Sequence, residues 1–117
     1  MAKAKKPQKV LSESQMLIRR RRAQMLIHSC IYYELNTNIV SDDVWQKWAD
    51  ELEYLQSQEK DIEIGFFDDD FRDWTGATGN HLPHRDPWVY AKAQYILELH
   101  EKSMNHRHPI DSLIDSR

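Results

Sequence analysis

The sequence predicts a mainly α-helical fold with one folded domain. Its 117 residues match the usual size of a single domain, and hydrophobic and charged residues make up 40% and 30% of it, which is a globular composition. Apolar residues recur at helical spacing in three segments. We expect an antiparallel helical hairpin at about 13–36 and 42–58, a long aromatic and acidic loop, and a third helix at about 87–103.

The first helix is predicted over about 13–36. Ser12 and Gln15 form a capping-box pattern just before a long stretch without proline or glycine. The polar segment 36–38 favours a turn, because its side chains compete for backbone hydrogen bonds. Two neighbouring series of apolar residues predict a broad buried face: Ala23, Leu26, Ile27 and Cys30, and Ile18, Met25 and Tyr32.

The second helix is predicted over about 42–58. Ser41, Asp42 and Asp43 supply cap candidates and place negative charge at the positive end of the helix dipole. A short link to the first helix makes the two helices antiparallel neighbours. The apolar residues at helical spacing are Trp45, Trp48, Leu52 and Leu55.

Residues 61–85 are predicted to form an irregular loop, with one helical turn near 68–73. Aromatic residues that pin this loop to the hairpin alternate with aspartates in the sequence. Asp86-Pro87 is a strong helix-start signal, because aspartate caps and proline is preset for the first helical position. On this third helix, the stripe predicted to face the protein core comprises Trp88, Ala91, Tyr95 and Leu99.

Within residues 16–56 the motifs His28-x-x-x-Tyr32-Tyr33, Ser41-Asp42 and Glu51-Leu52-x-x-Leu55 resemble the N-terminal helical hairpin of bacterial NAD-dependent DNA ligases. In that family this subdomain holds the nicotinamide mononucleotide half of NAD. The resemblance therefore implies a nucleotide contact through four residues: Tyr32, Tyr33, Asp42 and Trp45.

The chain departs from the ligase pattern at two positions. Trp45 stands where the family has tyrosine, and Gln46 stands where it has aspartate, so one carboxylate is lost. The chain also lacks a Lys-x-Asp-Gly nucleotidyltransferase motif and the length for adenylation and OB-fold domains. We therefore expect no enzyme, no catalytic residue and no resident cofactor. The alternatives are an NAD-binding or nicotinamide mononucleotide-binding protein, or aromatic residues that only pack the hairpin.

The segment from Trp74 to Trp88, with Gly76, Thr78-Gly79 and Leu82-Pro83 between, resembles small proteins of unassigned function in tailed phages and prophages of Gram-positive bacteria. This resemblance implies expression in an infected bacterial cell, and we expect a non-enzymatic accessory protein in its cytoplasm. We expect it to bind a host protein of the DNA-processing or antiviral defence machinery. The expected partner-binding residues are Phe66, Phe67, Asp69, Trp74, Arg85 and Trp88.

Charge is distributed unevenly along the chain. Residues 1–22 carry eight basic side chains and one acidic one, which is a net charge of +7. The whole chain has a net charge of −3, so residues 23–117 carry −10. We expect a basic flexible tail at 1–12, the domain at 13–103 and a mobile tail at 104–117. Nucleic-acid binding is a further alternative to a solvated basic surface. It would use Lys5, Lys6, Arg19, Arg20, Arg21 and Arg22.

Several other classes of site are excluded by the pattern of residues. The single cysteine, Cys30, excludes an intramolecular disulfide, and no apolar run approaches the length of a membrane span. His81 and His84 match no zinc signature, and Asp68, Asp69 and Asp70 lack the remaining ligands of a calcium loop. We therefore predict no metal site, no membrane partner and a cytoplasmic location. The oligomeric state stays open.

Overall fold

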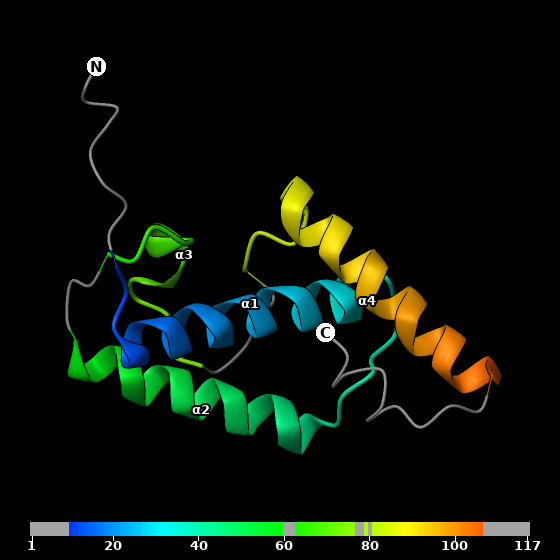
Figure 1. The fold of residues 1–117 in the computed structure, drawn as a ribbon, viewed down its shortest axis with the longest axis horizontal. Helices are drawn as coiled ribbons and strands as arrows, with labels where there is room; N and C mark the ends of the chain where they lie inside the picture. Colours follow the sequence, from blue (N-terminus) through cyan, green and yellow to red (C-terminus); the bar gives the residue numbers. More distant parts are fainter. Residues whose placement is uncertain (1–9, 60–62, 77–78, 80, 107–117) are drawn as a thin grey trace.

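The computed structural model describes residues 10–59, 63–76, 79 and 81–106. These residues form four α-helices and no strand: α1 (Glu13–Tyr33), α2 (Asp42–Gln58), α3 (Asp68–Phe71) and α4 (Pro87–His106). Helix α1 packs against both α2 and α4, and Figure 1 shows α1 and α2 side by side in opposite directions. The predicted mainly α fold with a helical hairpin is confirmed. Within this described part, no helix has the length and apolar character needed to cross a bilayer.

Helix α1 begins where the capping pattern predicts and ends earlier than expected. The Ser12 side chain accepts from the Gln15 backbone N–H, and the Gln15 side chain accepts from the Ser12 backbone N–H. The helix stops at Tyr33 instead of residue 36, because Asn36 takes a left-handed conformation with φ of 58°. Helix α2 spans the predicted residues, and the Ser41 side chain caps it by accepting from the Val44 N–H.

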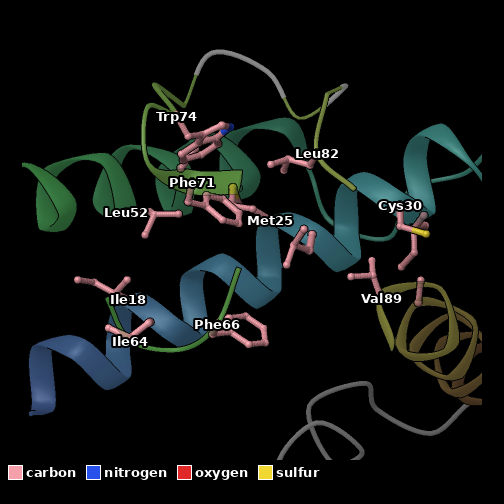
Figure 2. Close-up of a cluster of buried hydrophobic side chains, with 14 residues drawn as sticks. Ile18, Met25, Cys30, Leu52, Ile64, Phe66, Phe71, Trp74, Leu82 and Val89 are labelled. Atoms are coloured by element: carbon pink, nitrogen blue, oxygen red, sulfur yellow. The ribbon is translucent and has the colours of Figure 1, made fainter. Parts of the chain in front are cut away.

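The core lies between the hairpin, the loop after α2 and the start of α4. In the view of Figure 2, Phe71 and Trp74 of the loop lie next to Leu52 and Met25 of the hairpin. The loop aromatics therefore do pin it to the hairpin, and α3 is the single helical turn expected there. The buried apolar residues are Ile18, Met25, Leu26, Cys30, Ile31, Ala49, Leu52, Ile64, Phe66, Phe71, Trp74, Leu82, Val89 and Ala93.

The prediction of which face of α4 is buried is wrong. Trp88 and Tyr95 are 38% and 51% exposed, whereas Val89 and Ala93 are fully buried. Small and β-branched side chains on this face fill the narrow space between α4 and α1 better than large rings would. The helix also continues to His106, three residues beyond the predicted end.

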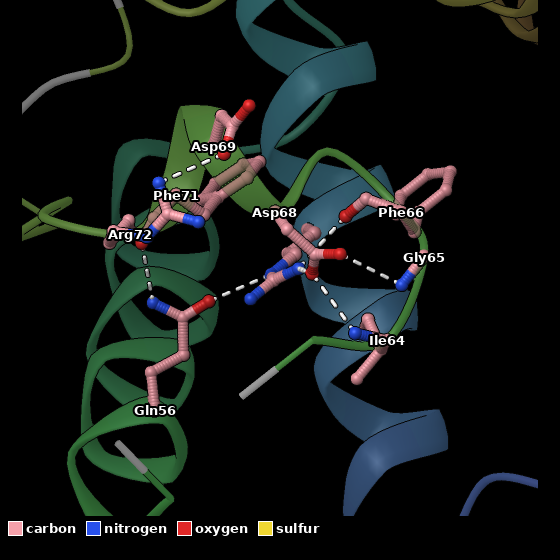
Figure 3. Close-up of polar contacts among 9 residues, drawn as sticks. Gln56, Ile64, Gly65, Phe66, Asp68, Asp69, Phe71 and Arg72 are labelled. Atoms are coloured by element: carbon pink, nitrogen blue, oxygen red, sulfur yellow. Dashed lines mark hydrogen bonds and ion pairs between the residues drawn. The ribbon is translucent and has the colours of Figure 1, made fainter. Parts of the chain in front are cut away.

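A buried arginine, Arg22, fastens the loop before α3 to the hairpin, and Figure 3 labels its partners Gln56, Phe66 and Asp68. Arg22 is 1% exposed and donates 2.8 Å hydrogen bonds to Gln56 Oε1, Phe66 O and Asp68 Oδ1. Asp68 in turn accepts from the backbone N–H groups of Ile64 and Gly65. Partial burial alone would raise the pKa of Asp68, but these hydrogen bonds and the Arg22 charge hold it below its ordinary value. The loop therefore has a fixed position against α1 and α2.

Candidate functional site

An open cleft of about 370 Å³ lies where the two hairpin helices and the link between them meet. All four residues that the ligase resemblance predicts as nucleotide contacts border this cleft. The structure thus brings together side chains from the end of α1 and the start of α2. The lining residues are His28, Ser29, Tyr32, Tyr33, Asn38, Ile39, Val40, Asp42, Trp45, Gln46 and Gly79.

Aromatic side chains border the cleft. Tyr32, predicted as part of the apolar face of the first helix, is instead 54% exposed, and its ring meets Tyr33 edge to face with centroids 4.8 Å apart. The Tyr33 ring also stacks on the His84 ring, with centroids 5.2 Å apart. Trp45, from α2, is partly buried and contacts Trp74 at 6.5 Å. Tyr33 and Trp45 are thus held from outside the cleft, while Tyr32 is free to contact a ligand.

Two buried polar atoms in the cleft lining have no hydrogen-bond partner among the described residues: His28 Nδ1 and Ser29 Oγ. Burial lowers the pKa of His28 to about 4, so its imidazole is neutral at neutral pH. A buried polar atom without a partner is costly, and such atoms are normally satisfied by water or a ligand. Sequence reasoning used His28 only as a motif residue and missed Ser29, because their lack of partners depends on the tertiary structure.

Asp42 supplies the only charged side chain at neutral pH among the described residues that line the cleft. It is exposed, and no hydrogen bond or ion pair joins it to another described residue. Because Ser41 provides the cap of α2, the Asp42 carboxylate is not needed for that role. Gln46, which replaces the second family carboxylate, instead donates to Asp50 Oδ1 at 3.0 Å and to Gly76 O at 3.3 Å. It therefore braces the loop against α2.

One wall of the cleft is Gly79, whose carbonyl is bound by His84 from the segment just before α4. A Cβ at Gly79 would overlap Ser29 Oγ and lie 3.4 Å from the Trp45 ring, so the backbone packs closely there. The ring Nε2–H of His84, which is buried, donates to Gly79 O at 2.6 Å. Glu34 lies 3.6 Å from His84 Nδ1 and binds Arg85 at 3.1 Å. Arg85 thus forms an ion pair with Glu34.

The single cysteine lies behind this wall and belongs to the core. Cys30 Sγ donates to His84 O at 3.3 Å, and the side chain is fully buried. Burial, followed by the nearby Glu34 charge, raises the pKa of the Cys30 thiol to about 11. The thiol therefore stays protonated and supports the position of His84.

The residues predicted to bind a host protein do not share one surface. Phe66 and Trp74 are 8% and 6% exposed, so both belong mainly to the core. Phe67 and Trp88 are more exposed and form a ring cluster with Phe66, with centroid distances from 4.9 to 6.4 Å. Arg85 pairs with Glu34 at the end of α1. Asp69, exposed, pairs with Arg72. Host-protein binding stays a prediction, with Phe67 and Trp88 as its accessible aromatic residues.

The arginine run predicted as a nucleic-acid surface divides among several contacts. Arg21 pairs with Glu51 at 2.8 Å, and Arg22 is buried, so neither offers a free charge. Arg19 lies over the Phe66 ring at 4.3 Å, and Arg20 is exposed. Lys5 and Lys6 lie outside the described residues.

Among the residues that the structure describes, no three His, Cys, Asp or Glu side chains are grouped as a metal ion would require. His81 is exposed, whereas His84 is buried and engaged with Gly79. These two histidines therefore differ in environment and role.

The chain was compared with protein-family models, with curated proteins and with solved structures, and none of the three comparisons gives a match.

Proposed function

We propose that this protein binds a nicotinamide nucleoside or nucleotide in the cleft at the end of the hairpin. One observation carries the proposal: Tyr32, Tyr33, Asp42 and Trp45, from the end of α1 and the start of α2, border a single open cleft whose lining residues hold unpartnered polar atoms. Pockets with aromatic walls and a few polar groups are the usual form of small-molecule sites.

The nicotinamide ring suits the charge and chemistry of the lining. A cationic pyridinium is attracted to the faces of Tyr32 and Trp45 and to the Asp42 carboxylate. Its carboxamide has both a donor and an acceptor, which is what the neutral His28 ring and the Ser29 hydroxyl require. Both atoms are closed to solvent in this structure, so we expect the carboxamide to reach them only after a side-chain rotation at His28 or Ser29.

The ribose and phosphate would contribute unequally. Asp42 is placed to accept hydrogen bonds from ribose hydroxyl groups, which are strong when the acceptor is charged. No lysine or arginine is among the described residues that line the cleft, and His28 is neutral, so a phosphate finds no positive partner among them. We expect nicotinamide riboside and nicotinamide mononucleotide to bind with similar affinity, with Kd values on the order of 10–100 µM.

Isothermal titration calorimetry with the full chain tests the proposal. Nicotinic acid mononucleotide is the matched ligand, because its carboxylate lacks the amide donor and brings a second negative charge near Asp42. We expect it to bind at least about tenfold more weakly than nicotinamide mononucleotide. No heat with either nicotinamide compound at millimolar concentration would refute the proposal.

Adjacent aspartates give a matched pair of variants. Asp42→Asn removes the cleft carboxylate, and Asp43→Asn makes the same change one residue along, outside the cleft. We expect about a tenfold loss of affinity in the first variant and none in the second. Tyr32→Leu against Tyr54→Leu, an exposed tyrosine of α2, makes the same comparison for stacking. Equal effects within either pair would contradict the assignment of the cleft.

A further inference from the structure

A second surface, which shares no residue with the cleft lining, combines aromatic rings with positive charges that form no ion pair within the described part of the chain. We define the ring cluster as Phe66, Phe67 and Trp88, which joins the loop before α3 to the start of α4. The Arg19 guanidinium lies over the Phe66 ring at 4.3 Å, and Lys92 Nζ lies 5.9 Å from the Trp88 ring. Three segments far apart in sequence therefore meet at this surface.

The backbone is arranged so that neighbouring rings share the surface. Phe67 has a left-handed conformation with φ of 53°, which is uncommon for a residue other than glycine. Successive side chains of an extended segment point in opposite directions. The left-handed turn allows Phe66 and Phe67 to contact each other at 4.9 Å and Trp88 at 5.4 and 6.4 Å. An unfavourable conformation thus accompanies the grouping of these rings.

The positive charges at this surface are not used by the fold. Arg21, Arg22, Arg72 and Arg85 each form an ion pair with a carboxylate. Arg19 and Lys92 are exposed, and within the described chain neither forms an ion pair with a carboxylate. Among the aspartates near this surface, Asp68 binds Arg22 and Asp69 binds Arg72. Asp70 is an exposed negative charge on α3, and Asp86 accepts from the backbone N–H of Trp88 at 2.9 Å.

We propose that the ring cluster with Arg19 and Lys92 binds single-stranded nucleic acid. Exposed rings beside cations are the chemistry by which proteins stack unpaired bases and hold the neighbouring phosphates. Trp88 supplies the accessible indole, and the guanidinium of Arg19, supported by Phe66, presents its outer face to a second base. Lys92 contacts the phosphates. Duplex DNA fits this surface less well, because its bases are already stacked.

Fluorescence anisotropy with a labelled oligo-dT and a duplex of equal length tests this proposal on the full chain. We expect the single strand to bind at least about tenfold more tightly than the duplex, and its affinity to fall as salt rises. Heparin, a polyanion without bases, serves as a competitor that should displace the strand weakly. Equal binding of duplex and single strand, or affinity that salt does not change, would overturn the proposal.

Two pairs of variants separate stacking from general charge. Trp88→Leu should weaken oligo-dT binding about tenfold, whereas Tyr54→Leu, an exposed aromatic of α2, should leave it unchanged. Lys92→Gln should reduce the slope of log affinity against log salt by about 0.7, whereas Lys47→Gln, an exposed lysine of α2, should not. Circular dichroism verifies that each variant is folded. If Trp88→Leu binds as the parent chain does, the ring cluster is not the site.

Discussion

Replacing Arg22 by methionine is expected to destabilise the fold by about 3 kcal/mol. Methionine keeps much of the length and apolar volume of arginine but leaves Gln56 Oε1, Phe66 O and Asp68 Oδ1 without their donor. Loss of one member of a buried ion pair costs about 3–5 kcal/mol. The Asp68 side chain is 18% exposed and can recover some hydration, which places the expected cost near the lower end of that range.

Urea unfolding followed by far-UV circular dichroism measures this cost. Arg20→Met is the matched control, because it removes an exposed arginine of the same helix that forms no ion pair with a described residue. We expect the control to change the free energy of unfolding by less than about 0.5 kcal/mol. A difference below about 1 kcal/mol between Arg22→Met and the parent chain would refute the structural role given to Arg22.

The destabilisation caused by Arg22→Met is also expected to depend on pH. The pKa of Asp68 lies below its ordinary 3.8 in the folded chain, because hydrogen bonds and the Arg22 charge outweigh its partial burial. A depressed carboxyl pKa contributes stability that is present above the unfolded value and is lost as the pH falls through the folded value. The gap between the parent chain and Arg22→Met should therefore be full at neutral pH and narrow below about pH 3.8. A gap that does not narrow would contradict the pairing.

Two further predictions concern the cleft. Gly79→Ala would press its Cβ against the Ser29 side chain and should cost about 1–3 kcal/mol in thermal melts. Adding Ser29→Gly should restore most of that loss, and no recovery would show that these two residues are not packed together. Burial lowers the pKa of His28 from 6.5 to about 4, so the stability it gives is complete above pH 6.5 and falls by about 3 kcal/mol by pH 4. His28→Gln should flatten the dependence on pH, between 6.5 and 4, of the free energy of unfolding measured with urea. An unchanged pH dependence in this variant would count against the burial of His28.

Local signals predicted the helices better than they predicted the faces that those helices bury. Ser12 and Ser41 cap helices where the sequence indicates, because capping depends on neighbouring residues alone. The end of α1 was misplaced because it depends on Asn36 taking a left-handed conformation. In α4, the series with Trp88 and the series with Val89 are both periodic, and only the packing of α1 decides between them.

The candidate site was predicted in part for a similar reason. Tyr32, Asp42 and Trp45 were identified as a group through a resemblance to a sequence motif, and they border one cleft. The contribution of Ser29 was not predicted, because a serine inside a helix gives no sign that its hydroxyl will be buried without a partner. Arg22 was interpreted as a surface charge, because a run of four arginines is normally solvated.

That arginine run explains how one short segment can serve several parts of the molecule. Successive helical residues point in different directions, so Arg21 reaches α2, Arg22 reaches the loop and Arg19 reaches the ring cluster. The cleft and the ring cluster both include or contact this loop, which Arg22 fastens. Loss of both binding activities in Arg22→Met would therefore test neither proposal. Asp42→Asn and Trp88→Leu each act on one surface alone, so an effect of either variant on the other ligand would mean that the two sites are coupled through the loop.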